Sequence, residues 1–141
     1  LALPPDADID ITNTYNSTTR QLSTTVRCEF LNPLSSTYKL IVLLTEDSIV
    51  SPQKDYAATP SDVLNYVHRH MLRDVISANN WGSTVTTAPA AAGDTVVQTY
   101  NYALPAMFKN TTPNENHCHV VAYLYDAATY EVLQVEEKKI K

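Results

Sequence analysis

The chain has 141 residues, a net charge of −5, 44% hydrophobic residues and 18% charged residues. This length fits one domain that buries a sizeable core, and the composition excludes a disordered chain. The mild acidity argues against nucleic-acid partners, because phosphate backbones select basic surfaces. No apolar run approaches the roughly 20 residues of a membrane span, so we expect membrane contact only through an anchor outside this sequence.

The first residues of the chain indicate the end of a linker. Residues 1–6 contain Pro4 and Pro5, which stiffen the backbone. We expect that any targeting or lipid-anchor segment has been removed from this product. Residues 7–141 are then predicted to form a single β-sandwich domain.

Alternation of apolar and polar residues predicts a mainly β fold. Six strands are predicted at 7–16, 20–31, 37–45, 94–104, 117–126 and 130–140, with a further short strand at 84–87. The first two are expected to pair as a hairpin. Because turns join consecutive strands, the pattern favours an immunoglobulin-like antiparallel sandwich of about seven strands.

One α-helix is predicted inside this β pattern, at about 60–78. Thr59 is a suitable N-cap and Pro60 suits the first helical position. An apolar stripe at helical spacing follows, made of Leu64, Val67, His68, Met71, Leu72 and Val75. The strands at 37–45 and 118–125 are apolar on both faces, which requires cover on both. The third and sixth strands of an immunoglobulin-type sandwich are neighbours, so we expect the helix to cover the outer face of their sheet.

Two acidic residues begin a polar loop at 45–58. Glu46 and Asp47 leave a buried strand together and are candidate binding residues. A structural turn, in which the carboxylates accept hydrogen bonds from backbone amides or arginines, is the main interpretation. A carboxylate-based hydrolase is a weaker alternative, since a glycosidase needs two carboxyls across a cleft and neighbours on a strand point to opposite faces. We expect no catalytic residue.

The aromatic residues offer a second candidate site. The chain has nine Tyr and one Trp. A platform for a glycan or peptide is one interpretation, and packing within the sandwich is the other. The residues concerned are Trp81, Tyr100, Tyr102, Tyr123 and Tyr125. The expected partner is an unidentified protein or glycan.

Histidine and cysteine residues give weaker signals. His117 and His119 share a strand face at a spacing that suits zinc or copper, but no third ligand is identifiable. His68 is expected in the core, on the apolar helix stripe. Cys28 and Cys118 are expected to be free thiols, because the predicted strands place them too far apart for a disulfide. No cofactor is expected.

Four motifs occur in a distinctive order along the chain. They are LTEDSIVSPQ at 44–53, YVHRHMLR at 66–73, WG at 81–82 and VLQV at 132–135. Together they resemble the outer-membrane-protein twenty-eight family, the cell-surface lipoproteins of Gram-negative anaerobes. The resemblance extends over roughly residues 40–135, and it implies a lipid-anchored envelope protein.

This family offers no active site to transfer to the chain. Its members often carry a thioredoxin-like region ahead of a β-sandwich domain, but this chain has no Cys-x-x-Cys motif, so no redox role carries over. The resemblance therefore implies a non-catalytic domain. Such a domain would act in surface interactions or as the accessory domain of a longer protein.

Overall fold

The computed structural model describes residues 4–86 and 89–141. Residues 1–3 of the predicted linker, residue 87 of the predicted short strand and residue 88 of the following loop lie outside this part of the chain. The described strands are β1 (Ala7–Asn16), β2 (Gln21–Phe30), β3 (Tyr38–Glu46), β4 (Ile49–Lys54), β5 (Asp62–His68), β6 (Met71–Val75), β7 (Ser83–Thr86), β8 (Thr95–Ala103), β9 (Cys118–Asp126) and β10 (Val132–Lys139). The one helical segment in the described residues is a 3-10 turn, η1 (Glu115–His117), and no helix there could cross a membrane.

One antiparallel sheet contains β1, β2 and β8 in that order. β1 and β2 pair along their whole length, from Ala7 opposite Phe30 to Asn16 opposite Gln21. The side chain of Asn16 shapes the turn between them by accepting hydrogen bonds from the amides of Thr18 and Thr19. The predicted hairpin is therefore confirmed.

The second sheet has the order β10-β9-β3-β6, and β7 also pairs with β3. β3 and β9 are antiparallel neighbours, as predicted, with Ile41 opposite Tyr123. β6 and β7 pair with successive parts of one edge of β3: β6 with residues 43–46 and β7 with residues 38–40. The loop between β6 and β7 therefore crosses beside the middle of β3.

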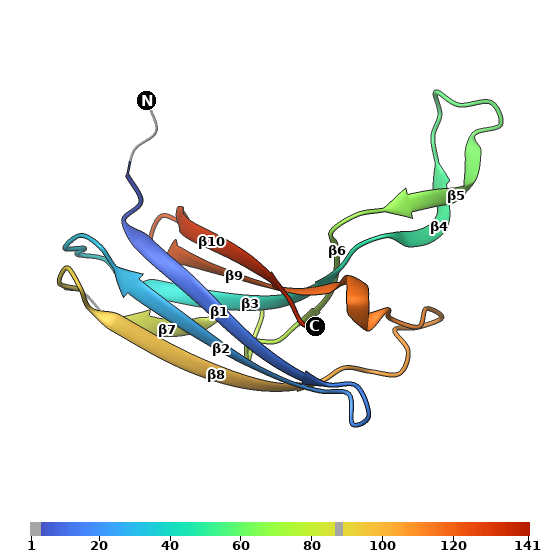
Figure 1. Cartoon of the computed structure of the whole chain (residues 1–141). Coiled ribbons are helices and arrows are strands. Elements are labelled where there is room, and N and C mark those ends of the chain that lie inside the picture. Colours follow the sequence, from blue (N-terminus) through green and yellow to red (C-terminus); the bar gives the residue numbers. More distant parts are fainter. Residues whose placement is uncertain (1–3, 87–88) are drawn as a thin grey trace.

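The two sheets pack over a shared apolar core (Figure 1). Alternate side chains of the long strands enter it, including Leu22 and Val26 from β2 and Leu40 and Leu44 from β3. Asn13 joins the sheets at one edge, because its side-chain amide donates to the carbonyl oxygens of Lys138 (3.3 Å) and Lys139 (2.9 Å). The fold is therefore mainly β, with two antiparallel sheets around one core.

The predicted helix at 60–78 is wrong. Those residues form β5, a turn and β6. Thr59 and Pro60 lie before β5 and do not cap a helix, and His70 turns the chain between β5 and β6 with a φ of 49°. The physical reason is backbone pairing that a helix would forgo: β6 pairs with the edge of β3, and β5 pairs with β4. His68 consequently lies on a strand, where its ring contacts that of Tyr66 (centroids 4.8 Å apart), and outside the core.

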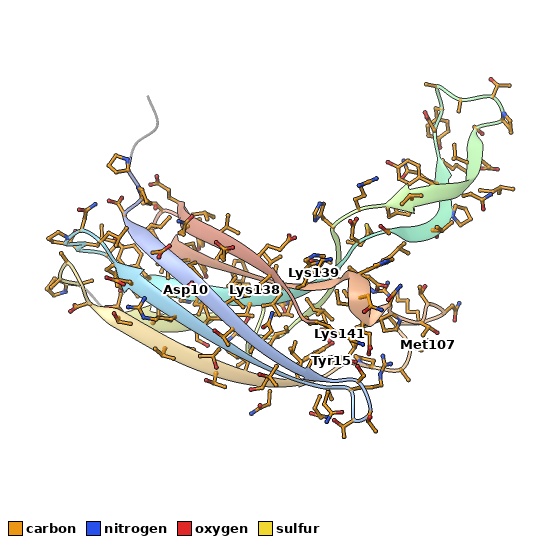
Figure 2. All side chains as sticks on the ribbon, in the orientation of Figure 1. Asp10, Tyr15, Met107, Lys138, Lys139 and Lys141 are labelled. Atoms are coloured by element: carbon orange, nitrogen blue, oxygen red, sulfur yellow. The ribbon has the colours of Figure 1, made fainter. Side chains whose placement is uncertain are left out.

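β4 and β5 form a separate two-stranded sheet that projects away from the body of the molecule (Figure 1). We call residues 49–68 the arm. Its side chains extend into open space on both sides of the ribbon (Figure 2). No residue of the arm belongs to the core of the two main sheets. The arm therefore depends on the pairing between β4 and β5.

Candidate functional site

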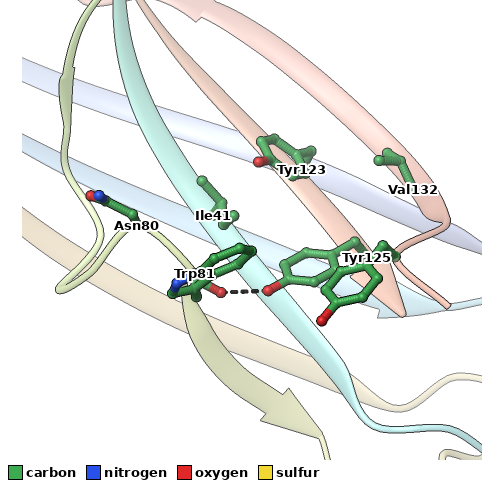
Figure 3. Close-up of a pocket in the computed structure, with 7 residues that line it drawn as sticks. Ile41, Asn80, Trp81, Tyr123, Tyr125 and Val132 are labelled. Atoms are coloured by element: carbon green, nitrogen blue, oxygen red, sulfur yellow. Dashed lines mark hydrogen bonds between the residues drawn. The ribbon is translucent and has the colours of Figure 1, made fainter. Parts of the chain in front are cut away.

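The outer face of the β10-β9-β3-β6 sheet carries a shallow pocket of about 220 Å³ (Figure 3). Residues 60–78, which were predicted to cover this face as a helix, form strands instead, and aromatic side chains stand on the face. We call the site the aromatic pocket. Its lining side chains carry no formal charge, and they are Ile41, Asn80, Trp81, Tyr123, Tyr125, Tyr130 and Val132.

The loop between β6 and β7 positions Trp81. The backbone amides of Ile76 and Ser77 both donate to the carbonyl oxygen of Val42, which fixes the start of the loop against β3. The side chain of Asn79 then accepts a hydrogen bond from the Trp81 amide at 2.8 Å. This local network holds the indole beside Ile41.

Gly82 allows this loop to approach the sheet closely. Its φ is +73°, and a Cβ at this position would overlap the carbonyl oxygen of Leu40 and crowd the side chain of Ile41. A glycine is therefore required twice over, by the left-handed backbone and by the close approach. The Trp81-Gly82 pair in the sequence is a structural unit that places the indole in the pocket.

Tyr125 connects the Trp81 loop to the sheet. Its hydroxyl donates to the Trp81 carbonyl oxygen at 2.6 Å (Figure 3), and burial raises its pKa. Its ring stacks on Tyr130, with centroids 6.3 Å apart and an interplanar angle of 14°. Tyr130 in turn lies 6.5 Å from Trp81 between ring centroids, at an angle of 53°. The three rings brace one another, so the pocket is preorganised.

The floor of the pocket comes from the sheet itself. Ile41 on β3 and Tyr123 on β9 are directly opposite each other. Trp81 and Tyr130 also line the pocket, and 65% and 67% of their surfaces are exposed. Rings held this open present flat apolar faces to solvent, with hydroxyl and indole N–H groups at their edges.

A second, polar pocket of about 370 Å³ lies next to the aromatic pocket and shares Val132 with it. The carboxylates of Asp6, Asp126 and Glu131 line it. Asp126 also shapes the β9–β10 turn, because its side chain accepts hydrogen bonds from backbone amides, and these lower its pKa. The two pockets thus join an apolar surface to a surface rich in hydrogen-bond acceptors.

Two of the predicted aromatic residues lie elsewhere. Tyr100 and Tyr102 are on β8, in the other sheet, and their rings pack against the core. The Tyr102 hydroxyl donates to Asp74 at 2.7 Å, and burial followed by this hydrogen bond raises its pKa. Neither residue lines the aromatic pocket.

Glu46 and Asp47 lie at the base of the arm. The buried Glu46 carboxylate contacts the Arg73 guanidinium at 2.9 Å and accepts a hydrogen bond from the Asn114 amide at 2.8 Å. Arg73 also lies over the Phe108 ring, 4.6 Å from its centroid. A hydrogen bond from the Ser48 amide is the main cause that lowers the pKa of Asp47. Glu46 therefore ties β3, β6 and the loop before η1 together, and neither acid lines a described pocket.

The candidate metal ligands are not brought together. The Nδ1 atom of His119 lies 3.1 Å from the backbone oxygen of His117, and its Nε2 atom lies 3.7 Å from Glu137. Within the described ranges no group of three or more His, Cys, Asp or Glu side chains is arranged to hold a metal ion.

Cys28 and Cys118 are free and buried, and burial raises their pKa values to about 11 and about 12.

The sequence pointed to part of the aromatic pocket. Trp81, Tyr123 and Tyr125 were among the candidate aromatic residues. Tyr130 and Val132 were missed, although a large aromatic residue directly after the turn at 126–129 is a usable signal. Their place in the pocket depends on how β10 folds back along β9.

Comparisons with known proteins agree with the fold and with the sequence resemblance. The family model "Outer membrane protein Omp28" matches residues 4–141, and a search of curated proteins found no match. Among solved structures, a domain of the outer membrane lipoprotein Omp28 from Porphyromonas gingivalis is similar, with a TM-score of 0.69 and 21% identity over 100% of this chain and 93% of that chain. A β-glucosidase from Kluyveromyces marxianus matches with a TM-score of only 0.38 and 10% identity, over 97% of this chain and 14% of that chain, which is too low to indicate a shared fold. Because the family model covers nearly the whole sequence, the chain belongs to the Omp28 family of outer membrane proteins, which places it at the outer membrane or cell surface.

Proposed function

We propose that this chain is a non-catalytic recognition domain of an envelope lipoprotein, and that it binds a neutral glycan in the aromatic pocket. The observation that carries the proposal is the exposure of the Trp81 and Tyr130 rings, both of which line the pocket. Large aromatic surfaces left open to water, beside a preformed hollow, are typical of a ligand site.

The shape and chemistry of the pocket favour a sugar ring. At about 220 Å³ it is smaller than the roughly 300–1,000 Å³ of pockets for drug-sized ligands, which suits a single ring. The apolar C–H face of a pyranose stacks on aromatic rings, while its hydroxyls reach polar groups such as the Asn80 amide at the rim. The lining is uncharged, so a neutral ligand is favoured.

A peptide fits this site less well. Extended peptides usually gain affinity by adding a strand to an open sheet edge. Here β3 and β9 form the floor, and each has a hydrogen-bonded neighbour on both sides. A peptide lying on this face would find side chains but no unpaired backbone groups.

The neighbouring polar pocket supports a ligand longer than one ring. It shares Val132 with the aromatic pocket, and its lining includes the acidic residues Glu131 and Asp6 as hydrogen-bond acceptors. Sugar hydroxyls are suitable donors to such groups. An oligosaccharide would therefore stack one ring beside Trp81 and direct the next ring toward Glu131.

The hydrolase alternative loses its support at Glu46. Its carboxylate is buried and engaged by Arg73 and the Asn114 amide, so it does not face a substrate cleft. We therefore propose a binding role without catalysis.

The glycan proposal is tested by titrating the chain with neutral disaccharides. Maltose, cellobiose, lactose and chitobiose are added in turn while the emission of Trp81, the single tryptophan, is recorded. We expect at least one sugar to change the emission with a Kd of about 1 mM, which corresponds to roughly 4 kcal/mol. Calorimetry with the same sugar gives an independent affinity.

A pair of Tyr→Ala variants controls this experiment. Tyr130→Ala removes one exposed ring from the pocket lining and is expected to weaken binding about tenfold, because the sugar ring loses an aromatic face to stack on. Tyr56→Ala removes an exposed ring on the arm and should bind as the unaltered chain does. The proposal fails if no sugar alters the emission at about 50 mM, if Tyr130→Ala binds normally, or if proline-rich peptides bind where sugars do not.

A further inference from the structure

The arm exposes apolar side chains that no described part of the chain covers. Val50 is 60% exposed and Leu64 is 66% exposed, and Tyr66 and Val67 are also open to solvent. Two-stranded sheets without a covering layer are marginal structures in water. We therefore expect a partner to cover this apolar surface of the arm.

The two edges of the arm differ in their capacity to pair. β4 contains Pro52, which has no backbone N–H to donate, so the outer edge of β4 is a poor partner for an added strand. β5 has the sequence DVLNYVH, which contains no proline and is rich in strand-forming residues. In the described residues β5 pairs only with β4, so its outer edge remains available for strand addition.

The residue pattern of β5 is complementary to itself in the antiparallel direction. With Asn65 at the centre, Val63 lies opposite Val67 of a second copy and Leu64 lies opposite Tyr66. Asp62 at one end then faces His68 at the other, with Arg69 next to it. Acid meets base at both ends of such a pair, whereas a parallel pair would place like groups together.

We propose that two copies of this chain associate through β5, which pairs antiparallel with β5 of the second copy about a two-fold axis at Asn65. The two arms then form one four-stranded sheet, and the exposed Leu64 and Tyr66 side chains pack across the axis. A symmetric pairing of identical strands closes on itself and stops at a dimer. A β-bulge opposite Pro52 lies at Leu64 and Asn65, so the strand bend falls at the axis in both copies.

The first test is the mass of the full chain in solution, by sedimentation equilibrium over a dilution series. We expect a reversible dimer of twice the 15.7 kDa of one chain. Asp62→Lys is expected to raise the dimer Kd at least tenfold, because it places a lysine opposite His68 and close to Arg69. His68→Glu should also raise the dimer Kd. The double variant Asp62→Lys/His68→Glu should recover much of the affinity, because it exchanges the two charges and restores the pair.

A matched control separates this effect from one inside a single arm. Asp62 also contacts Lys54 at 3.2 Å within the arm, and Lys54→Ala removes that ion pair without altering β5. Lys54→Ala should dimerise normally. Unchanged circular dichroism and Trp81 emission show that each variant is folded.

A cysteine at the axis tests the register. Asn65→Cys should form a disulfide-linked dimer on mild oxidation, because residues at the centre of an antiparallel pair have Cα atoms about 4.5–5.5 Å apart, within disulfide range. The native thiols are buried, and Thr129→Cys on the β9–β10 turn is the control for random cross-linking.

Three results would overturn the proposal. They are a monomer at every concentration, a dimer insensitive to Asp62→Lys, and cross-linking of Asn65→Cys no faster than that of Thr129→Cys. The outcome is independent of glycan binding. Tyr130→Ala lies outside the arm and should dimerise as the unaltered chain does.

Discussion

At the scale of single residues, Gly82 has the clearest role in building the candidate site. It combines a φ of +73° with a space that is closed by the Leu40 carbonyl and the Ile41 side chain. Gly93 has a similar φ of +88° but open space around it. The two glycines therefore separate the effect of backbone strain from the effect of steric overlap.

We predict that Gly82→Ala destabilises the fold by about 3 kcal/mol and weakens glycan binding, because the loop must move away from β3. Gly93→Ala should cost only about 1 kcal/mol, from its left-handed backbone alone. Urea unfolding, followed through Trp81 emission, measures both. Equal effects of the two substitutions would show that close packing at Gly82 is unimportant.

Glu46 shows why residue type alone misleads about function. In the sequence it is an acidic residue at the start of a polar loop. In the structure it is buried against Arg73, 27 positions later in the chain. The sequence shows the charge, but only the pairing of β3 with β6 shows that the charge is neutralised.

At the scale of elements, the arm is separable from the two main sheets, which we call the body. The arm consists of β4, β5 and their connection, and none of its side chains enters the core. The Glu46–Arg73 ion pair and the pairing of β3 with β6 lie at its base and belong to the body. The base is thus held together without the arm.

We predict that replacing residues 49–68 with a short turn leaves the body folded, with a Tm within several degrees of the original, because the arm buries little apolar area. Glycan binding should persist and dimerisation should disappear. Calorimetry, sugar titration and sedimentation measure the three properties. An unfolded product would mean that the arm contributes to the core.

At the scale of the whole molecule, three distant segments meet at one corner. Glu115 in η1 accepts hydrogen bonds from Lys141 (2.6 Å) and from Ser17 in the β1–β2 turn (2.8 Å). Figure 2 shows Lys141 at this corner, near Tyr15. The hydrogen bond from Lys141, followed by that from Ser17, lowers the pKa of Glu115 to about 2.

This pKa shift predicts how stability depends on acid. Because the folded pKa of Glu115 lies below its ordinary value of 4.5, the carboxylate stabilises the fold above pH 4.5, and that contribution is lost as the pH falls toward 2. Glu115→Gln should therefore flatten the decline in the free energy of unfolding over this range. Urea unfolding at several pH values tests this, with Glu136→Gln on an exposed strand position as control. Identical declines in Glu115→Gln and the unaltered chain would contradict the prediction.

The sequence by itself predicted the strands of the body other than β6, and it pointed to the family. The alternation of apolar and polar residues in segments such as 20–31 and 117–126 depends only on which side of a strand is buried, so the local sequence is enough to recognise it. Segment 60–78 was different, because its apolar residues fit helical spacing and strand pairing equally well. The tertiary structure decided for strands, since the edge of β3 offered β6 backbone partners that no local pattern records. The aromatic pocket was decided in the same way: the hydrogen bond from Tyr125 to Trp81 joins residues 44 positions apart, and only the folded sheet brings them together.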